Sequence, residues 1–323
     1  MKKTLTIITI LATLFIGTLA YAQSDNSMFV RSSPEAPGAF EETTLSLVSY
    51  SFNLDTSEIS WTLDGKLALS GAGKKSFTFT TKGVGSASTV NIKIITSGGE
   101  EIDRRVTIRP ANVDLLWQAT DSYVPPFYKG KVMPASETKF KVVAFSDIRT
   151  SSGTRPPNSS LNFTWKRNYE PVSGTNGLGR NSLSFKNSYM DEEEPVSVMV
   201  STLDGGGAGQ RQITLKMFNP EIIFYERHPL DGLRWHTALN NGFSLSSDET
   251  TIVAEPYFFT ENDLENEKFK ISWQMNNQSL QVDKKWELTV RPGASGGQAT
   301  LKVVMNNLVK LFQSAEGATR IGF

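Results

Sequence analysis

Short segments in which apolar and polar residues alternate recur along the chain. In STVNIKI, for example, Val90, Ile92 and Ile94 alternate with polar residues. An apolar residue at every second position is typical of a half-buried β-strand. Other segments of this kind are SFTFTT from Ser76, NSLSFKN from Asn181, PVSVMVS from Pro195, KKWELTV from Lys284 and ATLKVVM from Ala299. Long segments with helical spacing are missing, so the pattern predicts an all-β protein.

Three tryptophans mark a repeat of these segments. Trp61 in EISWTLDG, Trp165 in NFTWKRN and Trp273 in KISWQMNN are 104 and 108 residues apart, close to the length of one β-sandwich domain. The later strand begins 29, 31 and 28 residues after the tryptophan. Similar spacing implies similar strand pairing, because a slip by one residue would turn the apolar face to water. We therefore expect three tandem Ig-like antiparallel β-sandwich domains.

The neighbours of the tryptophans indicate their environment. Ile59, Phe163 and Ile271 lie two residues before them, which favours packing between two sheets over an exposed, sugar-stacking role. Turns at residues 97–99, 205–207 and 306–307 separate the last two strands of each copy. The predicted organisation is an extended lead-in at 23–39 and modules at 40–110, 111–219 and 220–323. Short joins between the modules favour a semi-rigid rod.

Residues 1–22 have the layout of a secretory signal peptide. Lys2 and Lys3 precede an apolar run from Leu5 to Leu19, and Ala20-Tyr21-Ala22 forms an A-x-A cleavage site. The run is shorter than the roughly 20 residues of a membrane-spanning helix, which argues against an uncleaved anchor. We expect Gln23 to be the first mature residue, no later integral membrane segment, and an extracytoplasmic protein that is periplasmic, secreted or on the cell surface.

Composition narrows the class of protein further. The chain has no cysteine, which excludes disulfides, thiolate metal sites and lipidation at cysteine, and favours a bacterial exported protein. N-x-S/T triplets begin at Asn158, Asn162 and Asn277, and we expect no glycosylation of them in a bacterial protein. After removal of the signal peptide, 31 basic residues face 33 acidic ones. This near-neutral balance gives no electrostatic case for nucleic acid or an anionic membrane as the main partner.

Residue types that carry catalysis or bind metals are sparse. His228 and His236 are the only histidines, and neither belongs to a serine-elbow or H-E-x-x-H pattern. A metal site on them would need a third ligand such as Glu226 or Asp231. Two acidic clusters lack the regular spacing of a calcium loop, and solvated loops that blunt a sheet edge are the favoured interpretation. The clusters are Asp191–Glu194 and the set Glu261, Asp263, Glu265 and Glu267. We expect a non-enzymatic protein without catalytic residues, metal or cofactor.

The best candidate for a recognition surface is a set of aromatic residues near the module junctions. Aromatic residues clustered with proline and arginine are typical of interface hot spots. The alternative is that they seal one module against the next. The set is Trp117, Tyr123, Phe127, Tyr128, Tyr225 and Trp235.

These features resemble bacterial Ig-like and PKD-like extracellular modules. The resemblance is carried by W-x-x-D-G at residues 61–65, by the Gly71-Ala72-Gly73 turn, and by the alternating strand before a Gly-Gly hairpin. YVPPFYKGK from Tyr123 is similar to a segment of exported proteins of this type. The second and third copies depart from W-x-x-D-G, with Asn168 and Asn276 but no following glycine.

The resemblance implies a sandwich fold, an extracytoplasmic location and a role as a spacer, adhesin or envelope-assembly part. We therefore expect a structural or adhesion protein whose partners are envelope or surface proteins. The alternative is a carbohydrate-binding protein, which would require solvent-facing aromatic residues on one sheet or at a loop tip.

Overall fold

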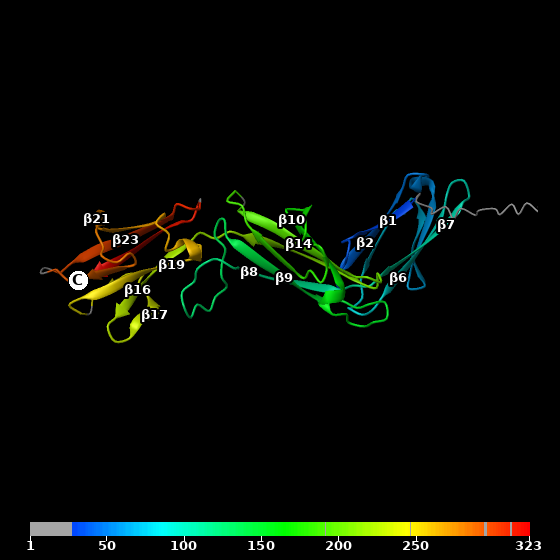
Figure 1. Ribbon diagram of the computed structural model, residues 1–323. Helices are drawn as coiled ribbons and strands as arrows, with labels where there is room; N and C mark the ends of the chain where they lie inside the picture. Colours follow the sequence, from blue (N-terminus) through cyan, green and yellow to red (C-terminus); the bar gives the residue numbers. More distant parts are fainter. Residues whose placement is uncertain (1–27, 191, 246, 294–295, 311) are drawn as a thin grey trace, which may run out of the picture.

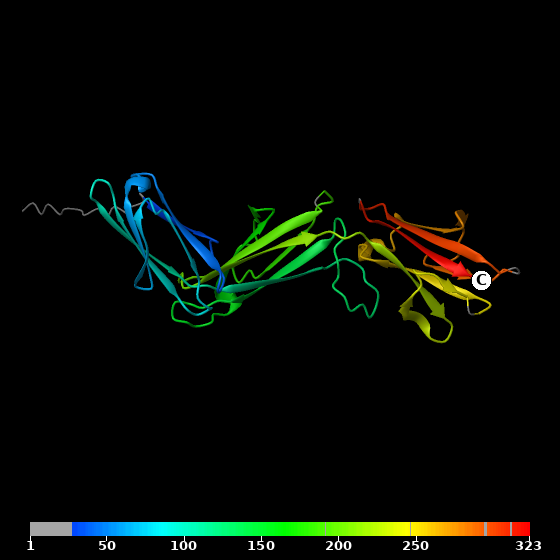
Figure 2. The same cartoon turned by 180° about the vertical axis from the view of Figure 1, so that it is seen from behind.

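The computed structural model describes residues 28–323 except 191, 246, 294–295 and 311. Across these residues, the strands form six sheets, two in each of three modules, and nearly all pairings are antiparallel. The modules follow one another along an elongated molecule (Figures 1 and 2). The prediction of three tandem Ig-like sandwiches is confirmed. The predicted signal peptide and residues 23–27 lie outside the described residues. Within the described ranges, no helix is long and apolar enough to cross a membrane.

The first module begins earlier than the sequence pattern suggests. Its first strand lies inside the predicted lead-in, which is therefore wrong for residues 28–33: Met28 packs in the core, and all six residues of the strand pair with the next one. One sheet has the order β1 (Met28–Ser33), β2 (Glu42–Ser49), β5 (Ser76–Thr80). The other has the order β4 (Lys66–Ala72), β3 (Glu58–Leu63), β6 (Ser88–Ile95), β7 (Glu101–Ile108), and a 3-10 turn, η1 (Leu54–Thr56), precedes β3.

The second module repeats this arrangement. Its smaller sheet has the order β13 (Ser182–Lys186), β9 (Lys139–Asp147), β8 (Asn112–Ala119). Its larger sheet has the order β11 (Glu170–Pro171), β10 (Leu161–Arg167), β14 (Glu193–Thr202), β15 (Ala208–Lys216), with β12 (Gly177–Leu178) also paired to β10 and η2 (Asn158–Ser160) before it. A long loop, residues 120–138, connects β8 to β9.

The third module adds a hairpin strand to the smaller sheet and a short parallel strand to the other. The first sheet has the order β17 (Gly232–Ala238), β16 (Glu221–His228), β19 (Thr250–Tyr257), β22 (Glu287–Val290). The second has the order β18 (Phe243–Ser244), β24 (Ser314–Gly322), β23 (Gln298–Asn307), β20 (Phe269–Met275), β21 (Gln278–Leu280), and η3 (Glu261–Asp263) precedes β20. Because β23 runs through Asn307, the turn predicted at 306–307 lies after those residues.

The three tryptophans are core residues, as predicted. Each lies between the two sheets of its module, with at most 2% of its surface exposed. Each indole N–H also donates a hydrogen bond to a backbone carbonyl, so this buried polar group is satisfied. The acceptor lies two residues before a strand of the smaller sheet, which is β5, β13 or β22. The acceptors are Lys74 O at 2.7 Å, Arg180 O at 2.7 Å and Lys285 O at 3.2 Å. The same contact in all three modules links the two sheets at the same place.

The same two-residue turn follows the tryptophan strand in each module. The turns are Asp64-Gly65, Asn168-Tyr169 and Asn276-Asn277, and all six residues have positive φ. Two central residues with positive φ are the mark of a type I′ hairpin, which favours Asn, Asp and Gly. The copies that depart from W-x-x-D-G therefore keep its turn. Tyr169, at φ 67°, is the exception in residue type, because a bulky side chain is rarely found in this region.

Candidate functional site

The long loop of the second module reaches the third module and pairs with it (Figure 1). The Tyr123 N–H donates to Phe259 O at 2.7 Å, and the Phe258 N–H donates to Tyr123 O at 2.8 Å. Ser122 and Thr260 form an antiparallel bridge beside this pair. The loop thus extends the backbone hydrogen bonding of the third module across the junction.

A buried side-chain hydrogen bond reinforces the same contact. The Tyr123 hydroxyl donates to Glu255 Oε1 at 2.5 Å, and Glu255 on β19 is only 9% exposed. Burial raises the pKa of the Glu255 carboxyl, while the bond from Tyr123 and the charge of Arg227 act in the opposite direction. Burial, with the bond to Glu255, raises the pKa of the Tyr123 phenol. The pair joins the two modules through a charge-assisted bond inside the junction.

Four of the six predicted recognition residues lie together at this junction. Tyr225 and Tyr257 are buried, and their hydroxyl oxygens are 2.7 Å apart. Trp235 packs edge-on against Tyr225, with ring centroids 5.1 Å apart. Tyr128 of the long loop packs edge-on against Tyr257 at 6.0 Å and contacts Phe258. Tyr123, Tyr128, Tyr225 and Trp235 therefore lie where the sealing hypothesis expects them.

The other two predicted recognition residues have different surroundings. Trp117 packs against Phe140 of its own module, with ring centroids 6.0 Å apart, and the Lys131 ammonium lies over its ring at 3.1 Å. Phe127 is 84% exposed at the tip of the long loop and has positive φ. Of the six residues, Phe127 has the greatest access to a partner.

His228 and Asp263 form ordinary ion pairs and hydrogen bonds. His228 lies 3.2 Å from Asp231, and Arg234 joins Asp231 at 2.8 Å to Glu226 at 3.0 Å. Asp263 accepts from Asn307 Nδ2 at 2.9 Å. The carboxylates of Glu226, Asp231 and Asp263 therefore already have partners, and in the described part of the chain no three metal-ligating side chains converge.

One residue of the first acidic cluster is buried. Glu194 is fully buried in the second module and pairs with Arg167, which corrects the expectation that this cluster is a solvated loop. Glu193 pairs with Lys216 at 2.8 Å on the surface, and Asp191 lies outside the described residues. A buried carboxylate needs such a partner because removing its charge from water is costly.

The first two modules are joined more simply. The Ala39 N–H donates to Asn112 Oδ1 at 3.3 Å, and Pro110 forms a parallel bridge with Ala208. Ala111 in the joining segment belongs to the core of the second module. A Cβ at Gly209 would lie 2.7 Å from Ala111 O, so glycine allows β15 to approach the joining segment this closely.

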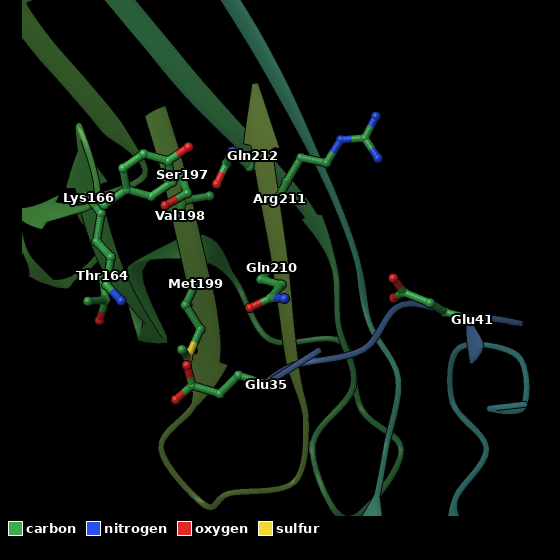
Figure 3. A pocket seen from close by; sticks show the side chains of 11 residues that line it. Glu35, Glu41, Thr164, Lys166, Ser197, Val198, Met199, Gln210, Arg211 and Gln212 are labelled. Carbon is green, nitrogen blue, oxygen red and sulfur yellow. The ribbon is translucent and has the colours of Figure 1, made fainter. Parts of the chain in front are cut away.

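A recess of about 430 Å³ lies beside this junction (Figure 3). Its floor is the outer face of the larger sheet in the second module, where alternate residues of β10, β14 and β15 point away from the core. The segment between β1 and β2 contributes two acids, and Figure 3 shows Glu35 extending toward Met199. The lining residues are Glu35, Glu41, Thr164, Lys166, Tyr169, Ser197, Val198, Met199, Gln210, Arg211 and Gln212.

A second cleft, of about 500 Å³, lies where the second module meets the third. It is more apolar than the recess, and the rings of Tyr189 and Phe312 stack at its edge with centroids 6.2 Å apart. Met190 and Phe312 are largely exposed.

Sequence reasoning does not find the recess or the Tyr123–Glu255 pair. Alternation identifies the outward residues of β14 and β15, but it does not reveal which loop of another module faces them. Glu255 interrupts the apolar segment TTIVAEPYFF, and a carboxylate inside such a segment is the one local signal for a buried pair.

The comparisons with known proteins agree with the fold class and go no further. No family model matches the sequence, and the search of curated proteins found no relative. Similar solved structures include the three N-terminal domains of the bacteriophage RB49 outer capsid protein Hoc. The sequences are 9% identical, the match covers 92% of this chain and 98% of that chain, and the TM-score is 0.26.

The central fibronectin-III array of RIM-binding protein is another similar structure, with 9% sequence identity and a TM-score of 0.32. This match covers 88% of this chain and 92% of that chain. A third is the Bacteroides ovatus protein SGBP-B, solved in complex with a mixed-linkage heptasaccharide, with 12% sequence identity and a TM-score of 0.24. This match covers 92% of this chain and 70% of that chain. The six sheets, two in each module, define the chain as an array of three Ig-like β-sandwich modules.

Proposed function

We propose that this chain is an exported, non-enzymatic rod that holds interaction surfaces at fixed positions in a bacterial envelope. The proposal rests on the junction between the second and third modules. Backbone pairing, the Tyr123–Glu255 bond and the buried aromatic residues restrict independent motion of the two modules. A flexible linker would instead let the modules reorient freely.

Phe127 is the residue that we propose for contact with an envelope or surface protein. Its ring is 84% exposed, and it lies on a loop whose neighbours Tyr123 and Tyr128 are anchored on the third module. An aromatic residue on an anchored loop binds at low entropic cost, which is typical of an interface hot spot.

Small-angle X-ray scattering of residues 23–323 tests the rod. Three modules end to end, each with strands of eight to ten residues, give a radius of gyration of about 30 Å, whereas a compact globule of this length gives about 19 Å. A value near that of the globule, or a broad distribution of sizes, would contradict the proposal.

Photo-cross-linking in the producing cell tests export and partner contact together. A photoreactive phenylalanine analogue at Phe127 should give a defined adduct with an envelope protein, and mass spectrometry should find a mature chain that begins at Gln23. The same analogue at Phe40, which is 76% exposed on the first module, is the matched control. Adducts at neither position, or an uncleaved chain in the cytoplasm, would refute the proposal.

A further inference from the structure

The recess beside the junction of the first two modules presents side chains that are free to bind a ligand. Within the described part of the chain, Lys166, Gln210 and Gln212 have no side-chain hydrogen bond or ion pair. They lie on the two strands that flank β14, since Ser197 of β14 pairs with Lys166 of β10 on one side and with Gln212 of β15 on the other. Neighbouring strands are about 4.8 Å apart, so the backbones of β10 and β15 are separated by about 10 Å, a span that the long side chains of Lys166 and Gln212 can bridge through one small molecule.

The charges around the recess are balanced and separate. Lys166 and Arg211 are cationic, Glu35 and Glu41 are anionic, and among these described residues no ion pair joins them. The Glu41 carboxylate is held in place by the Gly38 N–H at 2.6 Å. With two charges of each sign, the recess offers no net electrostatic attraction to an anionic or a cationic ligand. Balanced charge therefore favours a neutral ligand that both donates and accepts hydrogen bonds.

Tyr169 gives the recess an exposed aromatic face at the cost of backbone strain. It is 71% exposed, stacks on no other ring in the described chain, and occupies the left-handed turn position that Gly65 and Asn277 occupy in the other modules. A bulky residue at such a position is unfavourable, and strain of this kind is typical of functional sites. The fold therefore does not require tyrosine at this turn.

We propose that the recess binds a neutral oligosaccharide. The Tyr169 ring stacks on the apolar C–H face of one sugar, Gln210 and Gln212 donate to and accept from hydroxyl groups along the chain, and the Lys166 ammonium donates to a hydroxyl oxygen. Hydroxyl groups act as both donors and acceptors, which matches amides, an ammonium and carboxylates in one recess. A volume of about 430 Å³ lies within the range of small-ligand sites and suits one or two sugar rings, with the rest of the oligosaccharide along the open sheet.

Other ligand classes fit the recess less well. Nucleic acid requires an excess of positive charge, and the two carboxylates cancel it. An apolar ligand would remove the water from charged and amide groups without replacing their hydrogen bonds, which is costly. An extended peptide would pair with the backbone of the edge strand β15, whereas Lys166, Gln210 and Gln212 lie on the face of the sheet and would contribute nothing to that pairing.

Isothermal titration calorimetry with four neutral hexasaccharides, of glucan, mannan, xylan and chitin type, tests the proposal on residues 23–323. A polygalacturonate hexamer is the anionic comparison. We expect at least one neutral hexasaccharide to bind with saturation and the anionic one not to bind. Failure of all four neutral probes, or binding of the anionic one alone, overturns the proposal.

Tyr169→Asn is the most informative variant, because asparagine suits the left-handed turn and the variant should fold at least as stably as the wild type. We expect its affinity to fall by about tenfold or more, as for truncation of an aromatic hot spot, whereas Tyr169→Phe keeps wild-type affinity. Tyr50→Asn removes a similarly exposed tyrosine from the first module and serves as the control. Unchanged binding in Tyr169→Asn, or an equal loss in Tyr50→Asn, would place the ligand elsewhere. The proposed rod shape does not depend on the recess. Scattering can therefore contradict the rod while calorimetry supports sugar binding, and calorimetry can contradict sugar binding while scattering supports the rod.

Discussion

Removing the Tyr123 hydroxyl should weaken the third module selectively. In Tyr123→Phe, the ring keeps its packing, but Glu255 Oε1 loses the donor 2.5 Å away and remains buried. A hydrogen bond to a charged group contributes about 1.5–3 kcal/mol, so the free energy of unfolding of this module should fall by about 2 kcal/mol at pH 8. For a domain of about 100 residues, 1 kcal/mol shifts the melting temperature by about 4–8 °C, and the expected decrease is therefore about 10 °C.

Differential scanning calorimetry measures this decrease, because three modules can give separate transitions. We expect only the transition of the third module to move. Tyr50→Phe, which removes a hydroxyl from an exposed ring, should leave all transitions unchanged. If Tyr123→Phe melted at the same temperature as the wild type, the Tyr123–Glu255 hydrogen bond would contribute nothing to the stability of the third module, and the prediction would be wrong.

Three further predictions concern the pH response, the core and the first junction. Because burial raises the folded-state pKa of Glu255, the folded chain binds that proton more tightly than the unfolded chain, and stability falls as pH rises through the folded pKa. Glu255→Gln should therefore reduce the change in the third module's melting temperature between about pH 5 and pH 8, and an unaltered slope would contradict this assignment. Trp165→Phe leaves a cavity and removes the hydrogen bond to Arg180 O, so the free energy of unfolding of the second module should fall by about 2 kcal/mol in a guanidinium titration. No change in this free energy would contradict a core position for the tryptophan. Gly209→Val places side-chain atoms against Ala111 O, and scattering should show a wider distribution of sizes, whereas an unchanged profile would show that this close approach is not needed.

The repeat is readable from the sequence because one physical requirement acts in every copy. A strand with one buried face must alternate, and a tryptophan between two sheets has apolar neighbours, so Trp61, Trp165 and Trp273 are recognisable as core residues from sequence alone. The turn after each tryptophan is recognisable only where glycine is present. Asn168-Tyr169 adopts the same conformation, because the pairing of β10 with β11 fixes the backbone and tolerates an unfavourable residue.

The extent of the first module is less accessible to sequence reasoning. Residues 28–33 form a short segment before a proline-containing stretch, and so they resemble a lead-in. Their membership of the module depends on pairing with β2, a contact between segments that no local pattern encodes.

Local alternation and regular spacing are thus enough to define the all-β class, the number of modules and their buried tryptophans. Which surfaces meet is a property of the folded molecule alone. The fold places Tyr123 beside Glu255, 132 residues away, and brings Glu35 and Glu41 of one module over the sheet of the next. Such contacts depend on how folded modules pack against each other, and residues far apart in the chain carry no periodic signal of that packing.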